Sequence, residues 1–306
     1  MNRILVTGAS GFIGRHALQS LQQRGGAEIH AVASTRIPNH DPGCHWHVAN
    51  LLEGVALRQL FHEVRPTHLL HLAWYAKHGA FWDAVENFAW VQASLDMLRQ
   101  FEAHGGRRVV MSGTCAEYDW EFGYCVEKFT PLNPATTYGH CKNALRILLE
   151  EYCRRTGMSG AWGRVFLLYG PHEQPTRLVP FVIRALLQES TAKCTSGLQY
   201  RDFLHVEDVA HALVALLHSD LAGAVNVASG QPVTVREVVC EIAEILRRPQ
   251  LVEWGSVPDR PHDPPLLVAD VRRLNQECGW RPQHSLTAGL QRTIDWWRTQ
   301  LSTNSA

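Results

Sequence analysis

A tyrosine and a lysine four residues apart, Tyr138 and Lys142, could together carry out proton transfer. At this spacing the two side chains lie on one face of a helix. A free tyrosine has a pKa of about 10 and is a poor acid or base near neutrality, but a neighbouring ammonium stabilises the phenolate and lowers that pKa. The phenol can then give a proton to a carbonyl oxygen or take one from a hydroxyl group. Thr114 follows an apolar run at residues 107–111, and we expect its hydroxyl to hydrogen-bond the same oxygen.

A glycine-rich stretch near the N-terminus predicts where a cofactor would bind. Residues 7–14 follow the apolar run 4–6, which is typical of a short buried parallel strand. They precede a helical pattern that Gly25 and Gly26 close. Glycines let the backbone approach a pyrophosphate, and the free N–H groups at the start of the helix face the phosphates. The stretch therefore predicts a dinucleotide site with contacts from Gly8, Ser10, Gly11, Phe12, Ile13 and Gly14.

The end of the second expected strand, residues 28–33, bears on which dinucleotide binds. NAD sites usually carry Asp or Glu here to hold the ribose 2′-hydroxyl, whereas this chain has Ser34, Thr35 and Arg36. A hydroxyl and a guanidinium suit a 2′-phosphate. We therefore expect NADP(H), held in part by Ser34 and Arg36, with NAD(H) as the alternative. The turns after the third and fourth strands should add contacts from Asn50, Leu51, Leu72 and Ala73.

The rest of the first half alternates strands with helices. Five strand–helix units in succession predict an α/β fold with a doubly wound parallel (Rossmann) sheet. Ligands bind such sheets at the carboxyl ends of the strands, where Thr114 is expected. The further strands are predicted at residues 46–48, 67–73 and 107–111, and the helices at 57–64, 81–103 and 135–152.

Beyond Arg164 the pattern changes, because prolines interrupt it at residues 171–180 and 258–265. Between them, residues 201–217 and 225–227 are expected to return to the main sheet as strand and helix. We predict a smaller, discontinuous C-terminal substrate lobe beside the dinucleotide domain. The NAD(P)-binding domain would comprise residues 1–166 plus 200–232, and the substrate lobe residues 167–199 plus 233–300.

The composition excludes several other classes of protein. The formal net charge is zero, so no basic surface indicates a nucleic acid or an acidic membrane as partner. Eight scattered cysteines without a CxxC pair indicate a reduced, cytoplasmic protein, and no apolar run is long enough to span a membrane. His45 and His47 form the one close histidine pair, and no cluster of cysteines or carboxylates surrounds them in the sequence, so we expect no metal.

The motifs together resemble the extended short-chain dehydrogenase/reductases of the NAD-dependent epimerase/dehydratase family. The glycines follow that family's TGxxGxxG form, and residues 138–142 resemble its catalytic Tyr-x-x-x-Lys. Residues 201–210 are close to R-D-F-x-H-V-x-D-x-A, which is typical of nucleotide-sugar enzymes. Further matches, to Y-G-P, R-x-G-D and G-W-x-P, lie at residues 169–171, 260–263 and 279–282.

The resemblance assigns roles to particular residues. It implies that Thr114, Tyr138 and Lys142 are catalytic, and that the partner is a nucleotide-diphosphate sugar whose diphosphate is held by Arg201 and Arg260. The loop at 174–181 should contact the substrate, with Leu178 and Val179. In relatives two long apolar helices pair across a dimer interface, so the helices at 81–103 and 135–152 imply a homodimer.

Differences from the family's motifs narrow the range of possible reactions. Dehydratases carry Asp-Glu directly after the threonine, whereas this chain has Cys115 and Ala116, and alanine cannot act as acid or base. Hydride chemistry alone remains. Because Ser34-Thr35-Arg36 favours NADPH, the sequence predicts reduction of an NDP-4-keto-6-deoxyhexose at C4. The alternatives are an NAD-dependent NDP-sugar 4-epimerase and a non-catalytic NADP-binding sensor.

Overall fold

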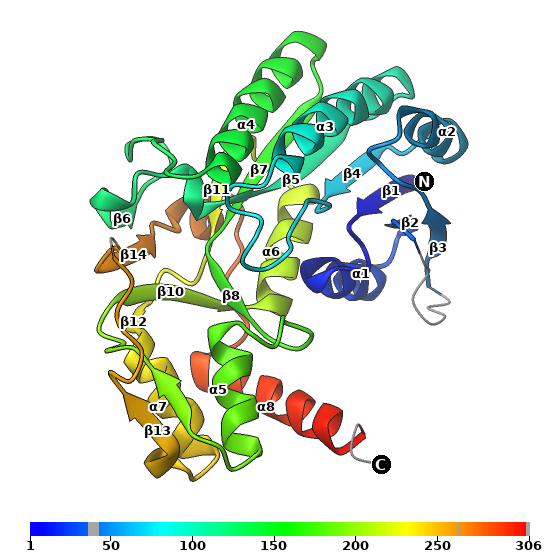
Figure 1. The fold of residues 1–306 in the computed structure, drawn as a ribbon. Helices are drawn as coiled ribbons and strands as arrows, with labels where there is room; N and C mark the ends of the chain where they lie inside the picture. Colours follow the sequence, from blue (N-terminus) through cyan, green and yellow to red (C-terminus); the bar gives the residue numbers. More distant parts are fainter. Residues whose placement is uncertain (36–42, 262, 304–306) are drawn as a thin grey trace.

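A computed structural model describes residues 1–35, 43–261 and 263–303 (Figure 1). Its main sheet has seven strands in the order β11-β7-β5-β4-β1-β2-β3, and every neighbouring pair is parallel. The doubly wound parallel sheet predicted from the sequence is thus confirmed. The strands are β1 Asn2–Thr7, β2 Ala27–Ala33, β3 His45–Val48, β4 His68–His71, β5 Arg108–Thr114, β7 Ser159–Val165 and β11 Gly223–Val227.

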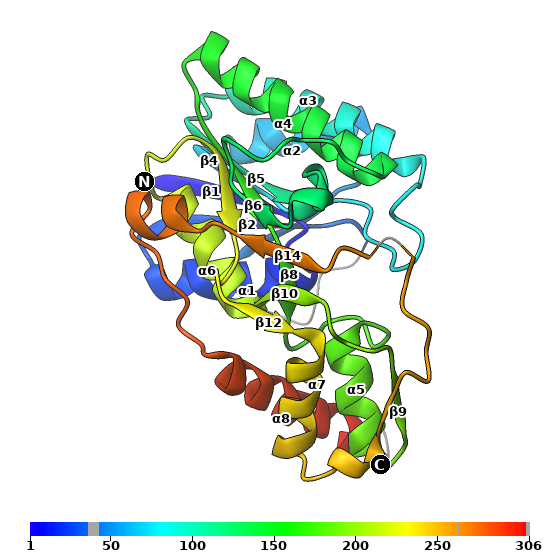
Figure 2. The same cartoon turned by 90° about the vertical axis from the view of Figure 1, so that its left-hand side faces the viewer.

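Helices cover both faces of this sheet because its strands are apolar on both sides. Ile4 and Val6 of β1 belong to one buried cluster with residues of α1 and α6, whereas Leu5 belongs to another with α2, α3 and α4. Figure 2 shows α1 and α6 on one side of the strands and α2, α3 and α4 on the other. The helices are α1 Phe12–Arg24, α2 Gly54–Val64, α3 Glu86–Ala103, α4 Thr137–Thr156 and α6 Val206–Leu217.

The helix predicted from residue 81 begins five residues later, at Glu86. Asn87 explains the difference, since its side-chain amide donates to the carbonyls of Phe81 and Ala84 and stabilises a turned segment before the helix. The backbone N–H of Tyr138 also donates to the carbonyl of Trp82 (2.8 Å). The segment before α3 is therefore fixed beside the start of α4.

A second, smaller sheet lies beside the carboxyl ends of the main strands. The expected return to the main sheet is confirmed for α6, which packs on that sheet, and for β11, which pairs with β7 at its edge. The strand expected at residue 201 is β10, and it belongs to this second sheet instead. Asp202 of β10 is buried and accepts hydrogen bonds from the backbone of Ser229, Gly230 and Ala269, which fixes β10 between distant segments. The strands are β6 Tyr124–Cys125, β8 Leu167–Tyr169, β10 Tyr200–His205, β12 Pro232–Thr234 and β14 Leu266–Ala269.

The C-terminal lobe is built from segments far apart in the sequence. Its helices α5 Leu178–Leu187, α7 Val235–Ile245 and α8 Leu286–Thr303 share one buried apolar cluster. Two short strands, β9 Ala192–Cys194 and β13 Val252–Trp254, pair at its edge. Figures 1 and 2 both show this group apart from the main sheet. Single turns of helix occur at Cys115–Glu117, Trp120–Phe122, Pro249–Leu251 and Arg273–Glu277. Among the described helices, none is both long and apolar enough to cross a bilayer.

Candidate active site

The glycine turn between β1 and α1 lies directly against the end of β4. Gly8 has a φ of 67°, and a Cβ atom there would lie 2.7 Å from the amide nitrogen of Ala73. A Cβ at Gly14 would collide with the carbonyl of Gly8. No side chain of the described residues caps the start of α1, so its first N–H groups stay available. The turn therefore fits a dinucleotide pyrophosphate.

The residues predicted to contact the rest of the cofactor lie in different environments. Ser34 is exposed just after β2, whereas Arg36 lies outside the described residues. Asn50 uses its amide locally, donating to Glu53 and accepting from the N–H of Leu52. Leu51 is buried in the core with α2 and α3. Half-buried positions are occupied by Ser10, Phe12, Ile13, Leu72 and Ala73.

His71 binds the ends of β1 and β4 together. Its ring nitrogens lie 2.7 Å from the hydroxyl of Thr7 and 3.0 Å from that of Ser94. The same Thr7 oxygen accepts from the N–H groups of Leu72 and Ala73. Burial, followed by the charge of Lys142, lowers the pKa of His71 to about 3. It is thus a neutral, structural imidazole beneath the cofactor turn.

The structure brings the three predicted catalytic residues together. α4 begins at the cap Thr136, and Gly139 packs so closely on the carbonyl of Ala116 that a Cβ atom would overlap it. This contact places Tyr138 beside Thr114, whose hydroxyl interacts with the phenol and lowers its pKa. Lys142 Nζ donates to the carbonyl of Ser112 on β5 (2.8 Å).

Lys142 is buried and Tyr138 is half-buried. Burial lowers the pKa of Lys142 to about 7, while the charge of Glu117 opposes that shift. Its ammonium lies 3.8 Å from the centre of the Trp74 ring, over the aromatic face. Burial raises the pKa of Tyr138, although the bond from Thr114 lowers it. The sequence predicts the opposite direction for Tyr138, because it gives no measure of desolvation.

A buried ion pair supports the site and was not predicted. Glu117 accepts from Arg164 Nε (2.7 Å), from the N–H of Thr114 and from the Trp162 indole (both 2.8 Å). Both charged side chains are inaccessible to solvent. Arg164 also donates to the hydroxyl of Tyr118. The available signal in the sequence was only that Arg164 stands in the otherwise apolar stretch at residues 161–169.

The predicted substrate residues lie around the opposite side of the site. Arg201 is buried, pairs with Asp263 (2.7 Å) and donates to the carbonyl of Pro264. Arg260 is exposed on the loop that leads to Asp263. Burial, followed by the charges of Arg177 and Arg260, lowers the pKa of His78.

Two further predicted substrate residues, Leu178 and Val179, begin α5. Val179 is buried in the core of the C-terminal lobe, and Leu178 is half-buried against it. The aromatic rings of Phe81 and Trp82 pack around Tyr138, with ring centroids 5.0 and 5.9 Å from that of Tyr138. The aromatic enclosure is therefore a feature that the substrate prediction missed.

A doubly wound sheet, a glycine turn at its first strand and a Tyr-x-x-x-Lys helix against its β5 define an oxidoreductase of the short-chain dehydrogenase/reductase type. Residues 4–228 match the NAD-dependent epimerase/dehydratase family, and the chain belongs to that family. It is 28% identical over 312 residues to the UDP-glucose 4-epimerase of Corynebacterium glutamicum, covering 92% of each protein.

Solved structures agree with this assignment. The structure of UDP-glucose 4-epimerase from Thermus thermophilus in complex with NAD has a TM-score of 0.84 and 27% identity, over 97% of this chain and 99% of that one. MoeE5 in complex with UDP-glucuronic acid and NAD has a TM-score of 0.82 and 28% identity, over 98% of this chain and 100% of that one. The expected family and enzyme class are thus confirmed.

The pKa of Lys142 predicts how stability depends on pH. The unfolded chain keeps this proton up to about pH 10, whereas the folded protein loses it near pH 7. Between these values the unfolded state binds more protons, so the free energy of unfolding rises with pH. We expect Lys142→Met to stabilise the protein most at about pH 6, with a gain that shrinks toward about pH 9. Urea denaturation across this range tests it, and a pH-independent gain would contradict the shift.

The buried ion pair predicts a large and specific loss of stability. Glu117→Gln leaves the guanidinium of Arg164 buried without a countercharge and should lower the free energy of unfolding by about 3–5 kcal/mol. The double variant Glu117→Gln/Arg164→Met should lose less than the sum of the two single changes. The exposed pair Glu151–Arg154 is the control, and Glu151→Gln should leave the free energy of unfolding almost unchanged. Equal losses at both sites would show that Glu117 has no special role.

Proposed function

We propose that this protein is a nucleotide-sugar 4-epimerase that retains NAD. The observation that carries the proposal is the placement of Thr114, Tyr138 and Lys142 at the end of β5, with the glycine turn of β1 in the same sheet. The similar UDP-glucose 4-epimerases support this reading better than the 4-ketoreductase that the sequence favours.

The chain's own groups supply the proton chemistry at C4 of the sugar. When bound, the nicotinamide would accept hydride from C4 and return it to the opposite face of the sugar ring. Tyr138 takes the proton of the C4 hydroxyl and later restores it, and Thr114 fixes the same oxygen. Protonated Lys142, on the same face of α4, favours the phenolate. Trp74 and the Ser112 carbonyl hold the ammonium in this position.

Dehydration finds no support in the residues beside Thr114. Ala116 carries no ionisable group, and burial raises the pKa of the Cys115 thiol, so this residue stays neutral. A single specific feature favours the second candidate, an NADPH-dependent 4-ketoreductase, namely Ser34-Thr35-Arg36 at the end of β2. Arg15, just beyond the glycines, is engaged with the Ser10 carbonyl and His172, and so gives that candidate no further support.

Basic side chains across the site suit the diphosphate of the substrate. The charges of Arg177 and Arg260 both act on His78, and Arg260 is solvent-exposed. Guanidinium groups bind phosphate through paired donors and a permanent charge. Arg201 would contribute after exchanging Asp263 for phosphate, or by holding the Arg260 loop through that ion pair. We assign this task to Arg177 and Arg260, in the proposed lobe of residues 167–199 plus 233–300, together with Arg201 of β10.

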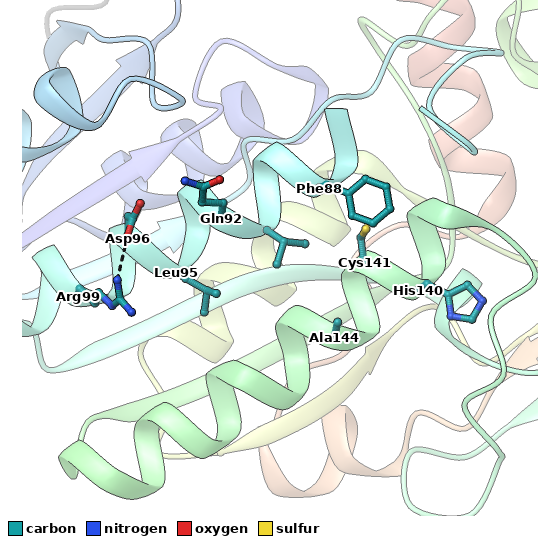
Figure 3. Close-up of a pocket in the computed structure, with 9 residues that line it drawn as sticks. Phe88, Gln92, Leu95, Asp96, Arg99, His140, Cys141 and Ala144 are labelled. Carbon is teal, nitrogen blue, oxygen red and sulfur yellow. Dashed lines mark hydrogen bonds and ion pairs between the residues drawn. The ribbon is translucent and has the colours of Figure 1, made fainter. Parts of the chain in front are cut away.

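We also infer that two copies of the chain associate through α3 and α4. Figure 3 shows a groove between these helices, lined by Phe88, Val91, Leu95, Cys141 and Ala144. Phe88 on α3 is 62% exposed, and Ile147 and Leu148 on α4 are also exposed. Cys141, Ala144 and Leu148 follow helical spacing, so one apolar face continues along α4. A second copy of this face would cover it.

Cofactor release and turnover test the proposed reaction. Purified protein denatured in acid should release about one NAD per chain, and the native protein should interconvert a UDP-hexose with its C4 epimer without added cofactor. Tyr138→Phe should retain NAD and lose at least about 100-fold in kcat. The control Tyr124→Phe, on β6 of the second sheet, should keep full activity. Oxidation of added NADPH in the presence of a 4-keto sugar would favour the ketoreductase. Absence of turnover with every sugar nucleotide would favour the sensor.

If two chains associate through this face, a single charge placed in it should separate the dimer. Phe88→Glu places a carboxylate in the proposed apolar interface and should convert a dimer to a monomer in light scattering. Phe129→Glu is a matched control, because Phe129 is 81% exposed on a different segment. A monomeric wild-type protein, or a dimer unaffected by Phe88→Glu, would contradict this interface.

A further inference from the structure

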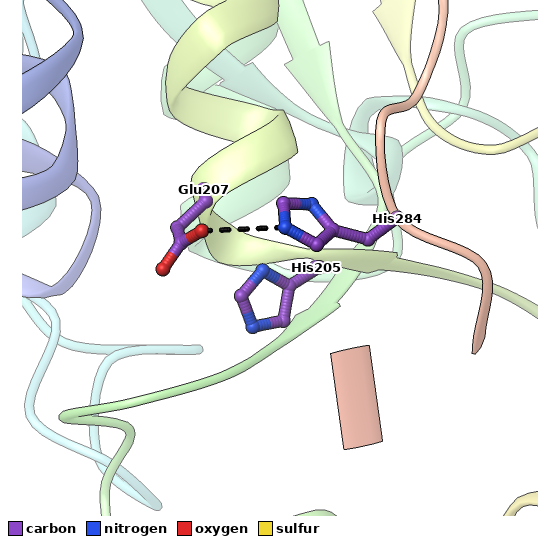
Figure 4. A group of neighbouring side chains, drawn as sticks. All are labelled: His205, Glu207 and His284. Atoms are coloured by element: carbon purple, nitrogen blue, oxygen red, sulfur yellow. Dashed lines mark ion pairs between the residues drawn. The ribbon is translucent and has the colours of Figure 1, made fainter. Parts of the chain in front are cut away.

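Three potential metal ligands meet where β10 runs into α6. His205 ends β10, Glu207 lies in the first turn of α6, and His284 lies in the segment before α8. One ligand atom from each lies within 4.8 Å of the other two (Figure 4). Among the described residues, no other group of three such side chains was found at this spacing.

The imidazole of His205 has no hydrogen-bond partner within the described part of the chain. Its side chain is 1% exposed, and both ring nitrogens are left unpaired by the residues that the structure describes. A buried polar atom without a partner is destabilising by about 1–3 kcal/mol, so such atoms are rare in native proteins. Figure 4 shows the ring directed toward Glu207 and His284. A metal ion between the three side chains would give one ring nitrogen of His205 a partner.

His284 is already held as a metal ligand would be. Its Nδ1 lies 3.1 Å from a carboxylate oxygen of Asp208, whose carboxylate also accepts the backbone N–H groups of Gln283 and His284. The other nitrogen, Nε2, points to Glu207. Metal-bound histidines typically donate their second N–H to a carboxylate in this way, which fixes the tautomer and the ring orientation.

The spacing between His284 and Glu207 fits a bound ion. Nε2 lies 3.4 Å from Glu207 Oε2, which is longer than a good hydrogen bond. Two ligands of tetrahedral Zn²⁺, each about 2.0–2.2 Å from the ion, lie roughly 3.4 Å apart. The other Glu207 oxygen pairs with Arg292 (3.1 Å), so Oε2 stays available as a single ligand atom.

We propose that His205, Glu207 and His284 bind a zinc ion, with Asp208 as the outer partner of His284. Two imidazoles and one carboxylate suit Zn²⁺, and a water completes the tetrahedron. The ion joins the start of α6, on the main sheet, to the segment that leads into α8. Its effect is therefore structural, and it stabilises the packing of the C-terminal lobe on the dinucleotide domain.

Zinc binding to the full-length protein tests this site. Protein stripped with EDTA is titrated with Zn²⁺ against a chromogenic chelator, and its melting temperature is measured with and without the ion. We expect one tight site per chain, a higher melting temperature, and the visible absorption of four-coordinate Co²⁺ when cobalt replaces zinc. Failure to bind zinc at this stoichiometry would overturn the proposal.

Variants locate the ion. Glu207→Gln and His284→Gln should each weaken binding more than about 100-fold, beyond the loss of an outer partner. Glu207→Gln keeps the His284–Asp208 contact, so it separates loss of the metal from loss of that bond. The control is His45→Gln/His47→Gln, in the other histidine group beside Glu28, which should bind normally. Binding that survives both site variants, or that is lost in the control, would refute the assignment.

Discussion

The contact between Gly139 and the carbonyl of Ala116 is the constraint on which the active site depends. Because glycine has no side chain, the start of α4 lies flush on the turn that follows β5. Tyr138 and Lys142 project from that same turn of helix and thereby reach Thr114 and the carbonyl of Ser112. A larger residue at 139 would move α4 outward and separate both reacting groups from β5 together. One backbone contact thus fixes three functional positions.

Desolvation then decides the electrostatics of that arrangement. Water is largely excluded around Tyr138 and Lys142, so burial disfavours the charged form of each. The aromatic face of Trp74 and the Ser112 carbonyl partly replace water around the ammonium. Glu117 adds a negative charge to this field and also accepts the N–H of Thr114. Arg164 compensates that charge, so a fixed ion pair replaces mobile solvent beneath the site.

Local patterns were predicted from the sequence, whereas long-range pairings were not. The turn at Gly8 and the Tyr138–Lys142 helix were found because all their determinants lie within a few residues. β10 was assigned to the wrong sheet because the partners of Asp202 follow it by 27 and 67 residues. Glu117 and Arg164 are 47 residues apart and belong to different strand ends. The start of α3 was misplaced because side-chain bonds of Asn87, rather than hydrophobic periodicity, end the preceding turn.

The residues proposed to react and the residues proposed to bind the substrate likewise come from different parts of the fold. The reacting groups come from β5 and α4, two neighbouring elements of the main sheet layer that hold one another rigidly. The charges that we propose for diphosphate binding come from Arg177, Arg201 and Arg260, which lie in segments far apart in the sequence. On this proposal, changes in those segments would alter which sugar nucleotide binds without moving Tyr138 or Lys142. Family membership therefore indicates hydride and proton transfer at a sugar carbon, while the choice among epimerisation, reduction and a particular sugar depends on the residues that surround the cofactor and the substrate.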